Sequence, residues 1–206
     1  MEITKFEHSC WEVIEDKSRL VIDRGIYSKS LTDFNNITAV VVTHEHADHL
    51  DSEVLAKIVE QNPSVQIFGT NQVAAQFNKN MTVPELGREY KVGDLSLEFF
   101  GEKHHLFDDV ENIAVLVNKK FFSGGDSYTK PNVPVELAAV PASAPWFRID
   151  EGIENIKTIK ARIVAPTHNA LLSEIGESIH YRILGGAAQQ AGKTWKVIKT
   201  GESIEI

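Results

Sequence analysis

Short apolar or alternating runs fill the first part of the chain and predict strands separated by turns. They cover residues 3–8, 10–14, 19–23 and 39–43. The run at 39–43 is continuously apolar and β-branched, which is typical of a strand buried on both faces. Asp51 and Ser52 then offer an N-cap, and apolar residues recur at helical spacing until Asn62-Pro63. These signals predict a helix between the cap and the proline.

The rest of the chain mixes further strands with three more helices. Strands are predicted at residues 65–68, 95–100, 113–117, 120–123, 137–140, 163–165, 195–198 and 203–206. Helices are predicted at 71–77, 149–159 and 173–190, the last weakened by Gly185-Gly186. Strands come first, a strand–helix alternation follows, and this order roughly recurs in the second half. The pattern predicts a layered α/β fold with two sheets between helices, in one domain.

The composition is that of an ordinary globular protein, with 42% hydrophobic and 24% charged residues among 206. A formal net charge of −8 makes nucleic acid or an anionic membrane an unfavourable partner. The single cysteine, Cys10, excludes an intrachain disulfide and is expected to be a small buried residue. We find no signal-peptide pattern and no apolar run approaching ~18 residues. We therefore expect a cytoplasmic protein that binds neither nucleic acid nor membrane; homo-oligomer formation stays open.

Four possible metal ligands lie within six residues, directly after the strand at 39–43. They are His44, His46, Asp48 and His49. In an irregular turn alternate side chains can point the same way, so His44 and His46 could serve one metal ion. Asp48 and His49 would then turn towards a second ion, because one tetrahedral zinc cannot easily take all four from so short a stretch. The spacing favours two metal ions over one, and a metal site over a solvated polar turn.

Further potential ligands follow later strands of the chain. His104 and His105 come after the strand at 95–100, and His168 comes after the strand at 163–165. Asp126 follows Gly124-Gly125, where glycine lets the backbone turn sharply. An α/β sheet usually carries its site just beyond the carboxyl ends of its strands. Each residue alone is a weak signal, but together with the histidine-rich turn they indicate one metal centre.

This order of residues resembles the metallo-β-lactamase-fold hydrolases. That superfamily has an H-x-H-x-D-H turn followed by a His, an Asp and a His, which here match His44, His46, Asp48, His49, His104, Asp126 and His168. The resemblance spans the chain from residues 6–10 to 166–169. Within that superfamily, the chain is similar to a group of small stand-alone bacterial metal-dependent hydrolases. The similarity lies at residues 101–104, 124–127, 143–146 and 168–172. It implies an αββα four-layer sandwich, two mixed sheets between helices, forming a single metallo-hydrolase domain over residues 1–206.

The resemblance also divides the seven matching residues between two metal ions. His44, His46 and His104 would bind the first ion, Asp48, His49 and His168 the second, and Asp126 would bridge them. His104 is preferred to His105 because it falls in a Gly-Glu-x-His motif. The expected cofactors are two divalent ions, zinc first, with manganese, iron and nickel also suited to mixed His and carboxylate ligands.

Four other residues are expected beside the ligands or in the substrate pocket. Asp23 matches a family Asp at the end of the third strand and would fix a ligand imidazole by a hydrogen bond. The family often has Asp-Pro-Gly where this chain has Asp23-Arg24-Gly25. His8 matches a His common in related sequences, and His105 either supports a ligand or is exposed. Trp146 either lines the pocket or packs as a core aromatic.

The resemblance implies a binuclear hydrolase that cleaves an ester, lactone or phosphoester of a small molecule. A metal-bridging hydroxide would attack, and Asp48 would be the catalytic residue that orients it and receives its proton. Similarity to ascorbate-6-phosphate lactonase relatives makes a lactonase-like activity one option. Two alternatives stay open: a non-hydrolytic metal-binding protein with a sensor or redox role, and a fold relative without metal. The sequence does not identify the substrate.

Overall fold

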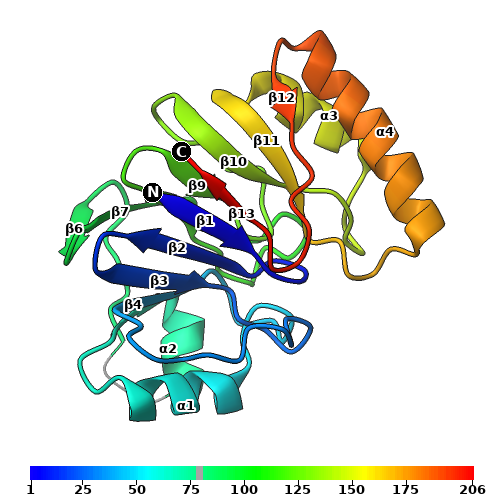
Figure 1. Ribbon diagram of the computed structural model, residues 1–206. Coiled ribbons are helices and arrows are strands. Elements are labelled where there is room, and N and C mark those ends of the chain that lie inside the picture. The colour runs from blue at the N-terminus through cyan, green and yellow to red at the C-terminus, as the bar shows by residue number, and fades with distance from the viewer. Residues whose placement is uncertain (78–80) are drawn as a thin grey trace.

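Two β-sheets pack face to face, and a pair of helices covers the outer side of each sheet (Figure 1). The computed structural model describes residues 1–77 and 81–206. The first sheet has the strand order β13 (Ser203–Glu205), β1 (Glu2–Lys5), β2 (Trp11–Glu15), β3 (Ser18–Ile22), β4 (Ala39–Val42) and β5 (Gln66–Gly69). The second has the order β12 (Thr194–Trp195), β11 (Ala161–Thr167), β10 (Val135–Pro141), β9 (Phe121–Ser123), β8 (Ala114–Val117), β7 (Leu95–Phe100) and β6 (Glu89–Val92).

Both sheets combine parallel and antiparallel pairs, which confirms the predicted sandwich of two mixed sheets. Strands β3, β4 and β5 are parallel, while β1, β2 and β3 are antiparallel. Strands β9 to β12 are parallel, and β6 to β9 form an antiparallel meander. Parallel neighbours bring the carboxyl ends of β3 and β4, and those of β9, β10 and β11, to common edges of their sheets. The last strand, β13, pairs with β1, so the two chain ends lie side by side (Figure 1).

The helices are α1 (Ser52–Gln61), α2 (Asn71–Phe77), α3 (Ile149–Thr158) and α4 (Glu174–Gln190). Helices α1 and α2 pack on the first sheet, and α3 and α4 pack on the second. Helix α1 begins as predicted, because the Asp51 carboxylate accepts the backbone N–H groups of residues 53 and 54. It ends at Asn62, whose side-chain amide donates to the carbonyls of Phe34 and Ile58. The capping residues that the sequence predicts therefore fix where this helix begins and ends.

Three apolar clusters separate the four layers. The central cluster fills the space between the sheets and includes the fully buried rings of Trp11, Phe99 and Phe121. The other two lie beneath the two helix pairs. Cys10 belongs to the cluster under α1 and α2, and burial raises the pKa of its thiol. The prediction that Cys10 is a small buried residue is confirmed.

The structure adds one strand to those predicted and changes the bounds of three others. Strand β6 was not predicted, because its Glu-Tyr-Lys-Val sequence is that of a polar edge strand with little burial. The strand predicted at 3–8 ends at Lys5, since His8 adopts a positive φ of 59° in the following turn. Strand β11 continues through Pro166, because β12 pairs only with residues 163 and 164 and requires no N–H from the proline. The strand predicted at 195–198 is reduced to Thr194–Trp195.

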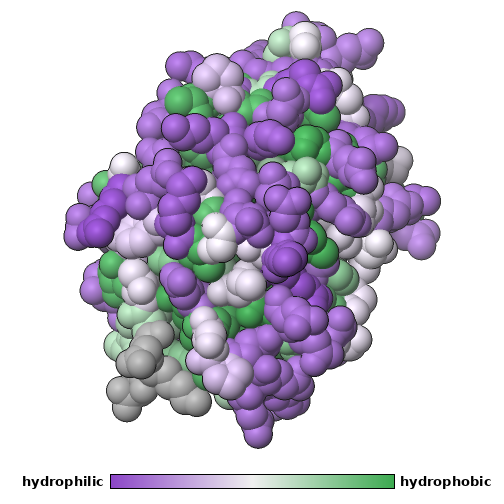
Figure 2. Space-filling view, turned by 60° about the vertical axis from the view of Figure 1, so that its left-hand side comes forward, coloured by the Kyte–Doolittle hydropathy of each residue, from purple (hydrophilic) through white to green (hydrophobic). Residues whose placement is uncertain are grey.

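Hydrophilic side chains dominate the face shown in Figure 2, and hydrophobic residues show between them in smaller patches. Among the described residues, no helix is both long and apolar enough to span a membrane.

Candidate metal centre

The histidine-rich turn after β4 is held from below by Asp23, at the end of β3. Asp23 adopts a φ of 51°, and its carboxylate accepts the Thr43 backbone N–H and the Thr43 hydroxyl, both at 2.8 Å. The same carboxylate accepts Nδ1–H of His49 at 2.8 Å. Gly25 lies directly against this turn, since a Cβ built on it would fall 2.0 Å from the Asp48 carbonyl oxygen. The turn therefore depends on Gly25 for space, and the Arg24 side chain donates to the Gly25 carbonyl.

One group of possible ligands combines His44 and His46 with His104 and Asp126. Nε2 of His44 lies 3.1 Å from Nδ1 of His46. Nε2 of His104 lies 3.3 Å from Oδ2 of Asp126, and Nε2 of His44 lies 3.9 Å from the same oxygen. His44, His104 and Asp126 are buried, while His46 is partly exposed. Three nitrogens and one oxygen therefore converge where the sequence predicts a first metal ion.

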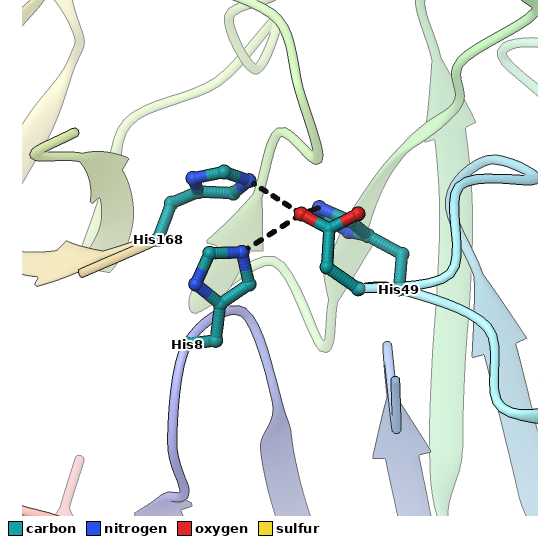
Figure 3. Close-up of side chains that lie close together, drawn as sticks. His8, His49 and His168 are labelled. Atoms are coloured by element: carbon teal, nitrogen blue, oxygen red, sulfur yellow. Dashed lines mark hydrogen bonds and ion pairs between the residues drawn. The ribbon is translucent and has the colours of Figure 1, made fainter. Parts of the chain in front are cut away.

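A second group combines Asp48 and His49 with His168 and His8. Figure 3 shows the three imidazoles around one carboxylate, which is that of Asp48. Its Oδ2 lies 2.9 Å from Nε2 of His8, 3.2 Å from Nε2 of His168 and 3.8 Å from Nε2 of His49. Nδ1 of His8 accepts the backbone N–H of Ala170 at 3.3 Å. Neutral His8 therefore carries its proton on Nε2 and donates it to Asp48.

Asp126 stands between the two groups. Its Oδ1 lies 3.1 Å from Nε2 of His49 and 3.2 Å from Nε2 of His168, whereas its Oδ2 faces His104. Trp146 donates its indole N–H to Oδ2 at 2.8 Å. One oxygen thus faces each group, which is the arrangement that a bridging carboxylate needs. Asp126 is 2% exposed, so solvent does not compete for either oxygen.

The buried atoms of this centre fit metal ions better than they fit one another. Seven buried side-chain N or O atoms among the described residues have no hydrogen-bond partner, and four of them are in this centre. They are Nε2 of His49, His104 and His168 and Oδ1 of Asp126. Unpaired buried polar atoms are rare because each one costs free energy. Nitrogen and carboxylate donors facing a common space are a suitable ligand set for divalent ions such as zinc.

In three of the imidazoles, a hydrogen bond at Nδ1 fixes the ring so that Nε2 faces the centre. His168 donates from Nδ1 to the Ser143 carbonyl at 2.6 Å, and His49 donates from Nδ1 to Asp23. The Thr43 hydroxyl donates to Asp23, so its oxygen accepts Nδ1–H of His44 at 3.1 Å. When these rings are neutral, Nε2 carries a lone pair directed at the centre. The Ser143 carbonyl had no signal in the sequence, because a backbone acceptor can belong to any residue type.

Burial opposes charge on each of these groups, and neighbouring charges decide the outcome. The facing imidazoles of His168 and His8 outweigh burial at Asp48, and the nearby imidazoles outweigh it at Asp126, so both carboxyl pKa values lie well below the usual range. The facing carboxylates outweigh burial at His168 and raise its pKa to about 9; the pKa of His49 is also raised. Burial and the adjacent His49 lower the pKa of His44.

The remaining predicted residues lie around this centre in different roles. The structure brings His104 into the centre, while Nε2 of His105 pairs with Glu151 at 2.9 Å. The ring of His105 packs 5.0 Å from that of Trp146, which is 7% exposed. Trp146 thus touches Asp126 itself, a contact that its position in the sequence did not indicate. Which atoms bind metal stays a prediction.

A family model described as the β-lactamase superfamily domain matches residues 2–168. The chain belongs to this family. The match includes every residue of both ligand groups, from His8 in the β1–β2 turn to His168 after β11. The predicted family is therefore confirmed.

Two curated relatives and one solved structure are similar to this β-lactamase superfamily member along most of their length. Protein Rv0786c of Mycobacterium tuberculosis is 28% identical over 190 residues, covering 88% of this chain and 90% of the relative. A UPF0173 metal-dependent hydrolase of Nanoarchaeum equitans is 24% identical, covering 82% and 83%. Igni18, a metallo hydrolase from Ignicoccus hospitalis, superposes with a TM-score of 0.78 at 18% identity, covering 100% of this chain and 98% of Igni18. The name of the Nanoarchaeum equitans relative agrees with the predicted class of metal-dependent hydrolase, and the structural match supports the fold.

Proposed function

We propose that the protein is a binuclear metal-dependent hydrolase that cleaves an ester, lactone or phosphoester of a small molecule. The position of Asp126 carries the proposal, because each of its oxygens faces a separate group of ligand atoms. Two divalent ions held there would activate a water molecule and polarise the oxygen of the scissile bond. Zinc suits the donor set first, and the small-molecule substrate and cytoplasmic location are parts of the same proposal.

The two carboxylates are suited to different tasks. The Asp48 side chain is 23% exposed, whereas the Asp126 side chain is 3% exposed. Substrate and solvent can therefore reach Asp48, while Asp126 is enclosed by imidazoles and the Trp146 indole. Asp48 would orient the attacking water and receive its proton. His8 would hold Asp48 in place, because its Nε2–H donates to Oδ2.

The proposal is tested by metal content and turnover together. Protein purified without chelator is expected to contain about two divalent ions per chain. It is expected to hydrolyse at least one member of a panel of lactones, esters and phosphodiesters. His46→Ala should lose both turnover and metal from the first group, because Nδ1 of His46 faces the His44 nitrogen.

Glu45→Gln is the matched control, since it alters the same turn but not the centre. The Glu45 carboxylate accepts from the Gln76 side chain at 2.6 Å on the α2 side. This variant should keep both metal and turnover. Two bound ions with no turnover of any substrate class would favour a sensor or redox role instead. Well under one ion per chain would support a fold relative without metal.

A further inference from the structure

Several large apolar side chains lie exposed beside the metal centre. Eleven large hydrophobic residues are exposed among the described residues, and five of them lie on three loops next to the two ligand groups. We call these five the apolar rim: Ile26, Tyr27, Leu106, Phe107 and Leu171. Their exposed fractions range from 41% to 54%. A patch of exposed apolar residues beside a polar site is typical of a ligand-binding surface.

Tyr27, Ile26 and Leu171 lie beside the second ligand group. The Tyr27 ring packs edge-on against His8, with the ring centres 5.3 Å apart. Ile26 donates its backbone N–H to the carbonyl of Ala47, within the histidine-rich turn. Leu171 directly follows the residue whose N–H binds Nδ1 of His8. These contacts place three rim residues around the side of the centre where Asp48 is exposed.

Phe107 and Leu106 lie beside the first ligand group. The Phe107 ring lies 5.9 Å from the His46 ring and 5.1 Å from the His104 ring. The backbone N–H groups of Leu106 and Phe107 both point at Nδ1 of His104, at 3.0 and 3.3 Å. The rim is therefore fixed to the ligands at both ends of the centre, by ring packing and by hydrogen bonds.

Two cations of the neighbouring segments are engaged within the fold. Lys5 is 2% exposed, and its ammonium donates to the Phe6 carbonyl and to the Asn169 side chain. Arg24 donates to the Gly25 carbonyl at 2.7 Å and lies 3.8 Å from the Asp51 carboxylate. Neither side chain is free to bind a negatively charged substrate.

Two of the three cations nearer the solvent, Arg148 and Lys103, lie beside acidic side chains, and Lys29 is the exception. Arg148 pairs with Asp150 at 2.7 Å, and Lys103 lies 3.8 Å from Asp108. Lys29 is exposed on the loop of Tyr27. A phosphate group carries up to two charges and is usually held by free arginine or lysine side chains. Apart from the metal ions and Lys29, the loops around the centre therefore provide few positive charges that could bind an anionic substrate. They do provide the five apolar side chains of the rim, on which an apolar group could pack.

We propose that the substrate is an uncharged carboxylic ester or lactone whose acyl or ring substituent is apolar and packs on the rim. This inference rests on the proposed hydrolytic function and narrows its substrate class. In the reaction, a water oxygen bonds to the acyl carbon and the acyl C–O bond breaks. The leaving alkoxide takes a proton, giving a carboxylic acid and an alcohol, or one hydroxy acid from a lactone.

The test compares p-nitrophenyl acetate, butyrate and octanoate with bis(p-nitrophenyl) phosphate on the metal-loaded protein. The specificity constant kcat/KM should rise by about fourfold for each added methylene that the rim buries. The phosphodiester should be the poorest substrate. Phe107→Ser should lower the ratio of the octanoate kcat/KM to the acetate kcat/KM, a ratio taken within each variant so that any change at the metal centre itself cancels. Val197→Ser is the matched control, because Val197 is 41% exposed and lies outside the rim.

A binding measurement separates failure of this inference from failure of the hydrolytic function. Acetohydroxamic and octanohydroxamic acids both bind metal ions and differ only in their apolar tail. Tighter binding of the octano compound, lost in Phe107→Ser, would support the rim even if no ester were hydrolysed. A flat ester series, equal hydroxamate affinities, or preferred cleavage of the phosphodiester would overturn the inference.

Discussion

Individual hydrogen bonds decide which ring nitrogen carries the proton, and they do so differently in the two ligand groups. His49 and His168 both donate from Nδ1, so their neutral rings direct the Nε2 lone pair at the centre. In His104 the roles of the two ring nitrogens are reversed. Its Nδ1 accepts two backbone N–H groups, so the neutral ring carries its proton on Nε2, 3.3 Å from Asp126. A metal ion at Nε2 of His104 therefore requires the ring proton to leave the nitrogen that faces the centre, while two N–H groups already occupy Nδ1. In His49 and His168 of the second group, Nδ1 already carries a proton, so Nε2 has only to lose its own proton to bind a metal ion.

We predict that the second group binds metal more tightly than the first. Titration of metal-free protein with cobalt(II), followed by its absorption spectrum, should show two binding steps. His168→Ala should remove the tighter step and His104→Ala the weaker one. A tighter step that survives His168→Ala but not His104→Ala would contradict the assignment.

Metal binding should also release protons. The facing carboxylates raise the pKa of His168 to about 9 despite its burial, so this ring is protonated at pH 7 without metal. A metal ion needs the neutral ring, and its affinity should therefore increase with pH up to about pH 9. Calorimetric titrations at pH 7 in buffers of different ionisation enthalpy should show at least one proton released for each two metal ions bound. Equal heats in all buffers would contradict this linkage.

At the scale of elements, the turn between β4 and α1 can form only because β3 ends in a glycine-containing segment. A Cβ at Gly25 would lie 2.0 Å from the Asp48 carbonyl oxygen and 2.5 Å from the His49 nitrogen. Both contacts are with backbone atoms, so the turn itself would have to shift. This shift would move the ligands of the second group.

Gly25→Ala is expected to lower the free energy of unfolding by about 3 kcal/mol, the upper end of overpacking costs. It should also weaken binding of the tighter metal ion. Gly186→Ala is the matched control, because Gly186 lies in α4 and an added Cβ would meet nothing within 4 Å. That substitution should raise stability by about 0.5–1 kcal/mol. Chemical unfolding of the metal-free proteins measures both; equal stabilities would contradict the role of Gly25.

The sequence predicted those elements whose signals are local. The buried strand β4, the cap of α1 and the ligands at strand ends each leave a pattern of residues in the chain. The role of His8 was only one option, because it depends on a contact with Asp48, 40 residues away. The carbonyl of Ser143 and the indole contact of Trp146 left no pattern, since both depend on how β10 and β11 are placed.

At the scale of the whole molecule, the centre joins the two sheets. Asp48 and His49 follow β4 of the first sheet, whereas Asp126 and His168 follow β9 and β11 of the second. Ions bound between them would therefore act as a link across the sandwich. Since the unfolded chain does not hold these groups together, metal binding should stabilise the fold.

Removal of metal is expected to lower the melting temperature. With free metal 100-fold above Kd, binding contributes about 2.7 kcal/mol. For a chain of this size that corresponds to about 5–10 °C in Tm. Scanning calorimetry before and after dialysis against chelator should show this shift, and added zinc should reverse it. An unchanged Tm would mean that the ions do not link the sheets.

The central claim is that Asp126 stands between two metal ions. Anomalous X-ray diffraction at the edge of the bound metal, on crystals grown without chelator, tests it most directly. Two peaks are predicted, one among His44, His46 and His104 and one among Asp48, His49 and His168, with an oxygen of Asp126 next to each. A single peak, or peaks elsewhere in the molecule, would contradict the binuclear centre.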